Sequence, residues 1–168
     1  MTTASWHADL MRVYLPTSLP MLRAWAAAGE VGPLPLTGFA VTPGLREWYA
    51  SADDEELEYA ATARAARSSL RLIPVSEPRR AVLVVVLDGQ SVTVRDDLTE
   101  GAVQLQAVVG WGQVACAFVD DSDAEPAVGE ALGAIDAADL EDPDAEFVVS
   151  TAEDHELQWF ATQEIATL

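Results

Sequence analysis

Two arginines near the start of the chain are the first candidates for binding an anion. Arg12 opens the apolar segment 12–15, and Arg46 lies in the aromatic segment 45–50. If both segments are neighbouring strands of one sheet, the two guanidinium groups lie close together and can hold an anion. The alternative is that each arginine pairs with a surface acid such as Glu47, which would leave no site.

His155 and a cluster of aspartates supply the other side chains that could do chemistry. His155 lies at an expected hairpin turn, where it is either a general base or metal ligand, or a solvated turn residue. Asp120, Asp121 and Asp123 lead from an expected strand into a helix. They could bind a divalent ion or transfer protons, but capping of the helix amides accounts for the same residues. The ligand-binding candidates are therefore Arg12, Arg46, Asp120 and His155.

The sequence contains no complete catalytic or metal-binding template. It has no lysine, which removes Schiff-base chemistry and the Walker phosphate loop. It has neither a Gly-x-Ser-x-Gly elbow nor a Rossmann glycine fingerprint. A metal site needs several ligands, and outside the N-terminal leader the expected domain has no second histidine to join His155. We expect no metal, no cofactor and no catalytic residue, and whether the protein is an enzyme stays open.

The acidic charge belongs almost wholly to the second half of the chain. The protein has 28 acidic and 9 basic residues, for a net charge of −19. All nine bases are arginines within the first 95 positions, and the last 73 positions carry 18 carboxylates and no base. This argues against broad nucleic-acid binding and excludes a polybasic membrane anchor, both of which need Lys and Arg. It favours a basic protein partner, although the same charge can simply keep a protein soluble and monomeric.

Length and composition indicate a folded domain without a membrane segment. Half of the residues are hydrophobic, but the longest apolar run, 81–87, is far shorter than the roughly 20 residues that span a bilayer. Residues 1–10 lack the basic and apolar parts of a signal peptide, so we expect a flexible leader, with Met11 as an alternative start. With Cys116 as its single cysteine, the chain forms no internal disulfide, which predicts a cytoplasmic protein. We expect either a monomer or a homodimer.

The elements that must position the candidate residues begin with a strand and a helix. Residues 12–15 are an expected strand, and Ser18 and Gly29 are suitable as the cap and the stop of the following helix. A longer helix is expected over 53–73 and a strand buried on both faces over 81–87.

Between these elements we expect a hairpin. Pro43 and Gly44 are typical of the centre of a tight turn, with strands 39–42 and 45–50 on either side. The resulting order β-α-β-β-α-β defines a ferredoxin-like sandwich over residues 11–88.

The second half repeats much of this order. A strand over 113–119, a helix from Pro126 to about 135, and a second hairpin of 147–150 with 157–160 predict an incomplete repeat over 112–168. Residues 89–111 would supply connecting strands.

Similar residues in the two expected hairpins suggest an internal duplication. Residues 39–42 match 147–150, and 46–50 match 157–161, which places Trp48 and Trp159 at equivalent, packed positions. The predicted fold class is therefore α+β, with two tandem ferredoxin-like repeats whose sheets pack face to face and can enclose a pocket. Arg64, Arg67 and Arg71 form a stripe that should contact the acidic half or a second copy.

Four stretches of the sequence resemble an actinobacterial family of short, uncharacterised proteins. They are residues 11–16 (MRVYLP), 41–49 (VTPGLREWY), 54–59 (DEELEY) and 155–160 (HELQWF). The resemblance covers nearly the whole domain from Met11 onward and implies no particular activity or catalytic residue.

Two hypotheses about function follow. The first is a non-catalytic binding or regulatory module whose acidic surface docks a basic protein. The second is a small-molecule-binding protein or enzyme with its pocket between the two sheets.

Overall fold

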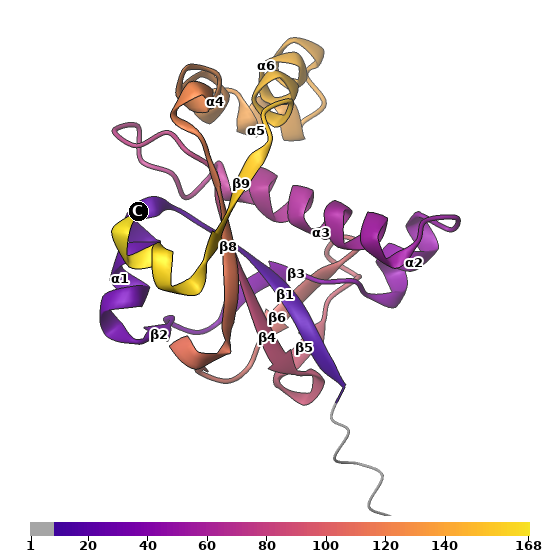
Figure 1. Cartoon of the computed structure of the whole chain (residues 1–168). Coiled ribbons are helices and arrows are strands. Elements are labelled where there is room, and N and C mark those ends of the chain that lie inside the picture. The colour runs from indigo at the N-terminus through magenta and orange to yellow at the C-terminus, as the bar shows by residue number, and fades with distance from the viewer. Residues whose placement is uncertain (1–8) are drawn as a thin grey trace, which may run out of the picture.

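The main sheet holds seven strands, and neighbouring strands pair in antiparallel fashion. The structure, a computed structural model, describes residues 9–168. Within that part the strand order is β5-β6-β3-β1-β4-β8-β9 (Figure 1). The strands are β1 (Leu10–Thr17), β3 (Leu36–Phe39), β4 (Ala81–Asp88), β5 (Val92–Val94), β6 (Ala102–Leu105), β8 (Val114–Asp120) and β9 (Leu157–Ala161). A separate two-stranded sheet joins β2 (Glu30–Val31) to β7 (Val109–Gly110).

Helices connect and cover these strands. The α-helices are α1 (Leu19–Ala28), α2 (Pro43–Trp48), α3 (Asp54–Ser69), α4 (Glu125–Leu132), α5 (Ile135–Asp139) and α6 (Pro143–Glu153). Short 3-10 helices are η2 (Gly89–Ser91), η3 (Trp111–Gln113), η4 (Ser122–Ala124) and η5 (Thr162–Thr167). The structure therefore confirms a mixed α and β fold.

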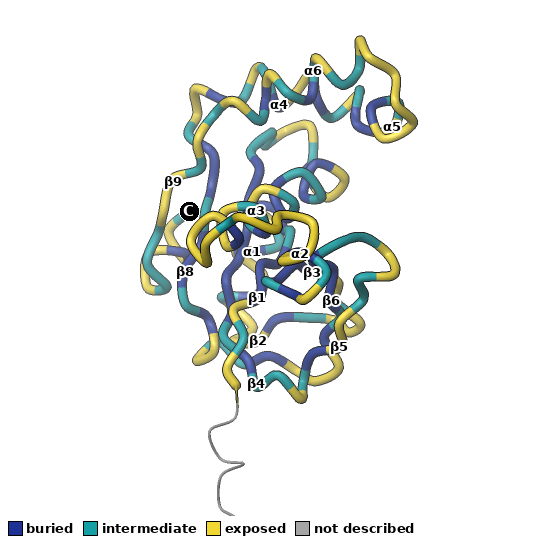
Figure 2. Tube along the Cα trace, turned by 90° about the vertical axis from the view of Figure 1, so that its right-hand side faces the viewer, coloured by how far each residue is buried: buried dark blue, intermediate teal, exposed yellow. Residues whose placement is uncertain are grey.

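The two faces of the main sheet are covered by different helices. Val13 and Leu15 of β1 point to the face on which α1 and η5 pack. Tyr14, between them, points to the opposite face, which α3 covers. Strand β4 is consequently buried on both sides, as predicted for 81–87, and the central strands are mainly dark blue in Figure 2.

Helices α4, α5 and α6 pack into a smaller unit beyond one end of β8 and β9 (Figure 1). Its apolar cluster includes Val128, Ile135 and Val149, and it reaches the end of α3 through Leu70 and Ile73. This unit brings the acidic α5 and α6 next to α3.

Local capping explains why the helices begin and end where they do. The Ser18 hydroxyl accepts a hydrogen bond from the Met21 N–H (3.3 Å), and Gly29 ends α1 in the left-handed conformation with φ of 76°. The Asp53 carboxylate accepts from the Glu56 N–H (2.9 Å) at the start of α3. The predicted starts of both helices are confirmed, although α3 ends at Ser69, earlier than expected.

Both predicted hairpins are wrong. Pro43 begins α2, where its missing N–H is not needed, and the Thr42 hydroxyl accepts from the Leu45 N–H (3.1 Å). Residues 147–150 lie inside α6, which Asp142 caps and Pro143 begins. In both segments a proline at the first helical position, preceded by a side-chain cap, starts a helix and does not centre or flank a turn.

The tandem-repeat interpretation is not confirmed. Residues 46–50, which lie in and just after helix α2, were matched to 157–161, which form strand β9, so the matched residues take different structures. Strands β1 to β9, apart from the β2–β7 pair, share one sheet, so the described residues do not form two sheets packed face to face. Helices on both faces bury the apolar strands instead. Trp48 and Trp159 lie outside the core, with 62% and 58% of their surfaces exposed.

The predicted leader falls mostly outside the described part of the chain. Residues 1–8 are not described, and Leu10 is already the first residue of β1. In residues 9–168, none of the helices has both the length and the apolar character needed to cross a bilayer.

Candidate functional site

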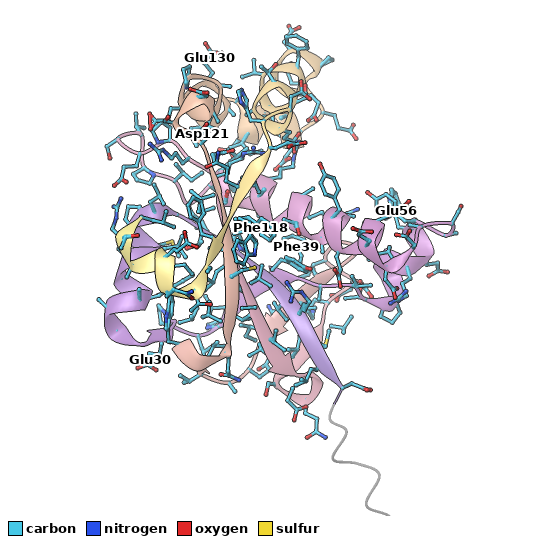
Figure 3. The ribbon with its side chains drawn as sticks, in the orientation of Figure 1. Glu30, Phe39, Glu56, Phe118, Asp121 and Glu130 are labelled. Atoms are coloured by element: carbon cyan, nitrogen blue, oxygen red, sulfur yellow. The ribbon has the colours of Figure 1, made fainter. Side chains whose placement is uncertain are left out.

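A cavity of about 440 Å³ lies between α3 and the main sheet. On the sheet side it is lined by the exposed Arg12 and the buried Tyr14 of β1 and by Phe118 of β8, and the turn from α6 into β9 lines one end. Phe118 is labelled in Figure 3, where it lies on the side of the sheet that faces α3. Helix α3 lines the cavity with residues of one face, namely Glu55, Glu58, Tyr59, Thr62, Ala63 and Ala66. This volume suits a small organic ligand.

Arg12 differs from the other arginines of the chain. Eight of the nine arginines have a carboxylate oxygen within 4.0 Å. Arg12 has none among the described residues, although it lines the cavity. Its pKa is raised, first by hydrogen bonding with Tyr14, so it stays charged. Arg12 is therefore a cation that nothing in the described chain neutralises by direct contact.

Tyr14 places a hydroxyl beside this cation. Only 2% of its surface is exposed, and it packs between β4 and α3, yet it lines the cavity. Its hydroxyl hydrogen has no acceptor within residues 9–168. Burial raises the pKa of Tyr14, and Arg12 opposes that shift only in part, so the hydroxyl remains a donor. Arg12 and Tyr14 together offer hydrogen-bond donors to an anion.

The other end of the cavity is built around a buried ion pair. Arg80 Nε and Nη2 donate to the two carboxylate oxygens of Asp120 at 2.8 and 2.7 Å, and the Arg80 N–H donates to the same group at 2.8 Å. The side chains are only 4% and 0% exposed. Arg80 Nη2 also donates to the His155 carbonyl oxygen (2.8 Å), which fixes the turn before β9. Arg80 lines the cavity, and its Nη1 has no acceptor in the described part of the chain.

Of the four ligand-binding candidates proposed from the sequence, two line the cavity and two do not. Arg12 and His155 both line the cavity. Asp120 does not line it and instead holds Arg80. Arg46 lies in α2 and not in a strand beside β1, and it pairs with the exposed Asp54 at 2.9 Å, so the expected joint site of two arginines was wrong.

Four glutamates give the cavity an acidic rim. Glu55 and Glu58 come from α3, Glu153 from the end of α6, and Glu156 from the turn after it. Burial raises the pKa of Glu153, against the opposing charge of Arg67, from which it accepts a hydrogen bond at 3.2 Å. Across residues 9–168 no group of three or more His, Cys, Asp or Glu side chains is placed to hold a metal ion.

Sequence reasoning missed Tyr14, Glu58 and Arg80. The signal for Tyr14 was present, because residues two apart on a strand share a face and Arg12 was already a candidate. For Arg80 there was no such signal, since neighbouring Arg79 has the same charge but pairs outside the cavity with Glu125.

The predicted arginine stripe on α3 does contact the acidic half of the chain. Arg64 lies 3.6 Å from Glu100. Arg67 pairs with Asp139, Glu146 and Glu153, and Arg71 with Asp136 and Asp139. The pairs of Arg67 and Arg71 tie α3 and the residues after it to α5 and α6.

Comparison with known protein families places the whole described domain in one group. The model of DUF6912, a family of unknown function, matches residues 11–168. The chain belongs to this family. The resemblance to an uncharacterised family is thereby confirmed, and the residues that line the cavity all lie within the DUF6912 match. No curated protein and no solved structure matches the chain.

Proposed function

We propose that the protein binds a small organic anion in the cavity between α3 and the sheet. The observation that carries this proposal is that Arg12, exposed in the cavity beside the buried Tyr14 hydroxyl, has no carboxylate partner within residues 9–168. A chain with 28 acids and 9 arginines has ample means to neutralise every guanidinium. An arginine left free in a cavity is therefore available to a carboxylate or phosphate, for which its planar group has suitable geometry.

The rest of the cavity suits an organic body attached to the anion. Tyr59, Phe118 and Leu157 provide aromatic and aliphatic surface, and Ala63 and Ala66 leave room above it. Ligand sites usually combine such apolar walls with a few directed polar groups. Arg80 offers a further donor, Nη1, at the far end of the cavity.

The test compares two aryl anions on the wild-type protein and on a matched pair of variants. Hydrocinnamate supplies a carboxylate and phenyl phosphate a phosphate, which separates the two sources of negative charge. Arg12→Gln should weaken binding about 10-fold or more, because hydrogen bonds to charged groups are worth roughly 1.5–3 kcal/mol. Arg46→Gln, outside the cavity, should bind as the wild type does.

Calorimetric titration measures these affinities. Tyr14→Phe should weaken binding by less than Arg12→Gln, because it removes one neutral donor. Failure of the wild type to bind either anion, or equal binding by Arg12→Gln, would overturn the proposal.

A second candidate function is docking of a basic protein on the acidic half. Eight of the 18 carboxylates after position 95 pair with an arginine, so ten remain without one among the described residues. Several of these are exposed, including Asp123, Glu130 and Asp144. Neutralising these three with Asn and Gln should lower the salt-sensitive capture of basic proteins from the native host. Capture that high salt leaves unchanged would contradict this candidate.

Location and assembly follow as expectations of the same proposal. The single Cys116 is buried and free, which fits a reducing compartment, and we infer a cytoplasmic protein on that basis. Cell fractionation with an antibody to the native protein tests the location, and light scattering distinguishes a monomer from a homodimer.

A further inference from the structure

Glu58 lines the same cavity as Arg12, yet the two do not pair. The pKa of Arg12 is raised first by hydrogen bonding with Tyr14 and to a smaller extent by the nearby charges, Glu58 among them. No oxygen of Glu58 comes within 4.0 Å of an arginine nitrogen in the described chain. The cavity is therefore lined by a positive and a negative group, both exposed and neither in an ion pair within the described chain.

A second glutamate strengthens the negative side. Glu55 precedes Glu58 by three residues on α3, so the two carboxylates lie on one face of the helix, and both line the cavity. Glu55 has no arginine within 4.0 Å among the described residues. A purely anionic ligand held by Arg12 would have these two carboxylates nearby with no compensating charge of its own.

A zwitterion with adjacent charges removes this conflict. We propose, resting on the proposed function above, that the ligand is an α-amino acid with an apolar side chain. Its carboxylate binds to Arg12 and the Tyr14 hydroxyl, and its ammonium group binds to Glu58 with support from Glu55. Its side chain extends between Tyr59 and Phe118 toward Leu157.

At the far end of the cavity, two charged side chains already have partners within the chain, whereas Glu156 has no arginine partner among the described residues. Arg80 is held by Asp120, and Glu153 accepts from Arg67. Arg80 and Glu153 are therefore less available to a ligand than Arg12 and Glu58, and we place the charge recognition at Arg12 and Glu58.

The experiment uses two matched series of small molecules on the full-length protein. One series is L-phenylalanine, hydrocinnamate and phenethylamine, and the other is L-leucine, isocaproate and isoamylamine. Within each series the side chain is similar, and only the ammonium or the carboxylate is removed. Calorimetric titration should give the amino acid the tightest binding, roughly 10-fold tighter than the carboxylate alone, with the amine weakest.

Two variants test whether the Glu58 carboxylate binds the ammonium group of the ligand. Glu58→Gln should abolish the preference for the amino acid over its carboxylate analogue. Glu56→Gln is the control, because Glu56 is an exposed neighbour on α3 that does not line this cavity. It should retain the preference.

The outcomes separate this inference from the proposed function. If the carboxylates bind as tightly as the amino acids and Glu58→Gln binds them better, the cavity is an anion site and the amino-acid inference fails alone. If the amines bind tightest, or if no member of either series binds, both the inference and the anion-binding proposal fail.

Discussion

Helix α3 carries charges on two sides, and the two sides treat them differently. On one side Arg67 donates to Asp139, Glu146 and Glu153, at distances from 2.8 to 3.4 Å. Arg71 adds a second bridge to Asp139. This group of ion pairs, called the α3–α6 network below, is satisfied within the chain and holds the smaller helical unit against α3.

On the other side α3 borders the cavity, and the charged residues Arg12, Glu55 and Glu58 there form no ion pairs within the described chain. Arg12 and Glu58 have opposite charges and line one space without pairing. A net charge of −19 means that acids are not scarce. Under the proposed function, Arg12 serves a ligand, whereas the arginines of the α3–α6 network serve the fold.

The largest effect is expected where the two roles meet, at the buried Arg80–Asp120 pair. Asp120→Ala leaves a guanidinium with 4% exposure uncompensated, which should cost about 3–5 kcal/mol of unfolding free energy. Denaturant unfolding measures this. Asp123→Ala, exposed and without an arginine partner in the described chain, should stay within about 0.5 kcal/mol of wild type. Equal effects of the two changes would show that the pair is not structural.

The α3–α6 network should give a smaller effect. Arg67→Met removes three partly exposed ion pairs and leaves the half-buried Glu153 without its cation. We expect a loss of about 1–2 kcal/mol, reduced by solvent screening and by added salt. Arg46→Met, which breaks only the exposed pair with Asp54, is the control and should change stability by less than about 0.5 kcal/mol. A salt-independent loss would argue against an ion-pair origin.

The same network predicts a pH dependence. Partial burial acts to raise the pKa of Asp139, but hydrogen bonds from Arg71 and Arg67 outweigh it, so the pKa is lowered. A lowered carboxylate pKa contributes stability above the unfolded value of about 3.9, and this contribution is lost as the pH falls through the folded value. Asp139→Asn should therefore flatten the loss of stability below about pH 5. If the stability of Asp139→Asn fell as steeply with decreasing pH as that of wild type, Asp139 would not be the source of this pH dependence.

The smallest effect on stability is expected on the cavity side. Arg12→Gln breaks no ion pair of the described chain, so its unfolding free energy should stay within about 0.5 kcal/mol of wild type while ligand binding weakens about 10-fold or more. Thermal unfolding with and without hydrocinnamate measures both quantities. A strongly destabilised Arg12→Gln would mean that Arg12 belongs to the fold, which would remove the contrast between the two sides.

Local signals predicted much of the secondary structure. The caps at Ser18 and Asp53, the stop at Gly29 and the apolar run 81–87 each act within a few residues, so the sequence alone reveals them. The pairing of the arginine stripe with the acidic half followed from charge, because all bases precede position 96 and most acids follow it.

The strand topology and most of the candidate site could not be predicted from such local sequence signals. Aromatic residues around Trp48 and Phe147 favoured strands, but caps at Thr42 and Asp142 followed by prolines made both segments helical. The cavity depends on how α3 lies across β1 and on the turn before β9, which are contacts distant in sequence. His155 was found because it stood out in type and Arg12 because it opens the first strand, whereas the roles of Tyr14 and Glu58 follow only from that packing.

The most direct test of the contrast uses the nine arginines as reporters. The Nε–H signals of isotope-labelled protein report on each guanidinium separately, and hydrocinnamate is the added ligand. The account predicts that the Arg12 signal shifts most, while those of Arg46, Arg67 and Arg71 stay in place because their carboxylates remain bound. A signal of Arg12 that does not move at saturating ligand, or larger shifts in the α3–α6 network, would contradict it.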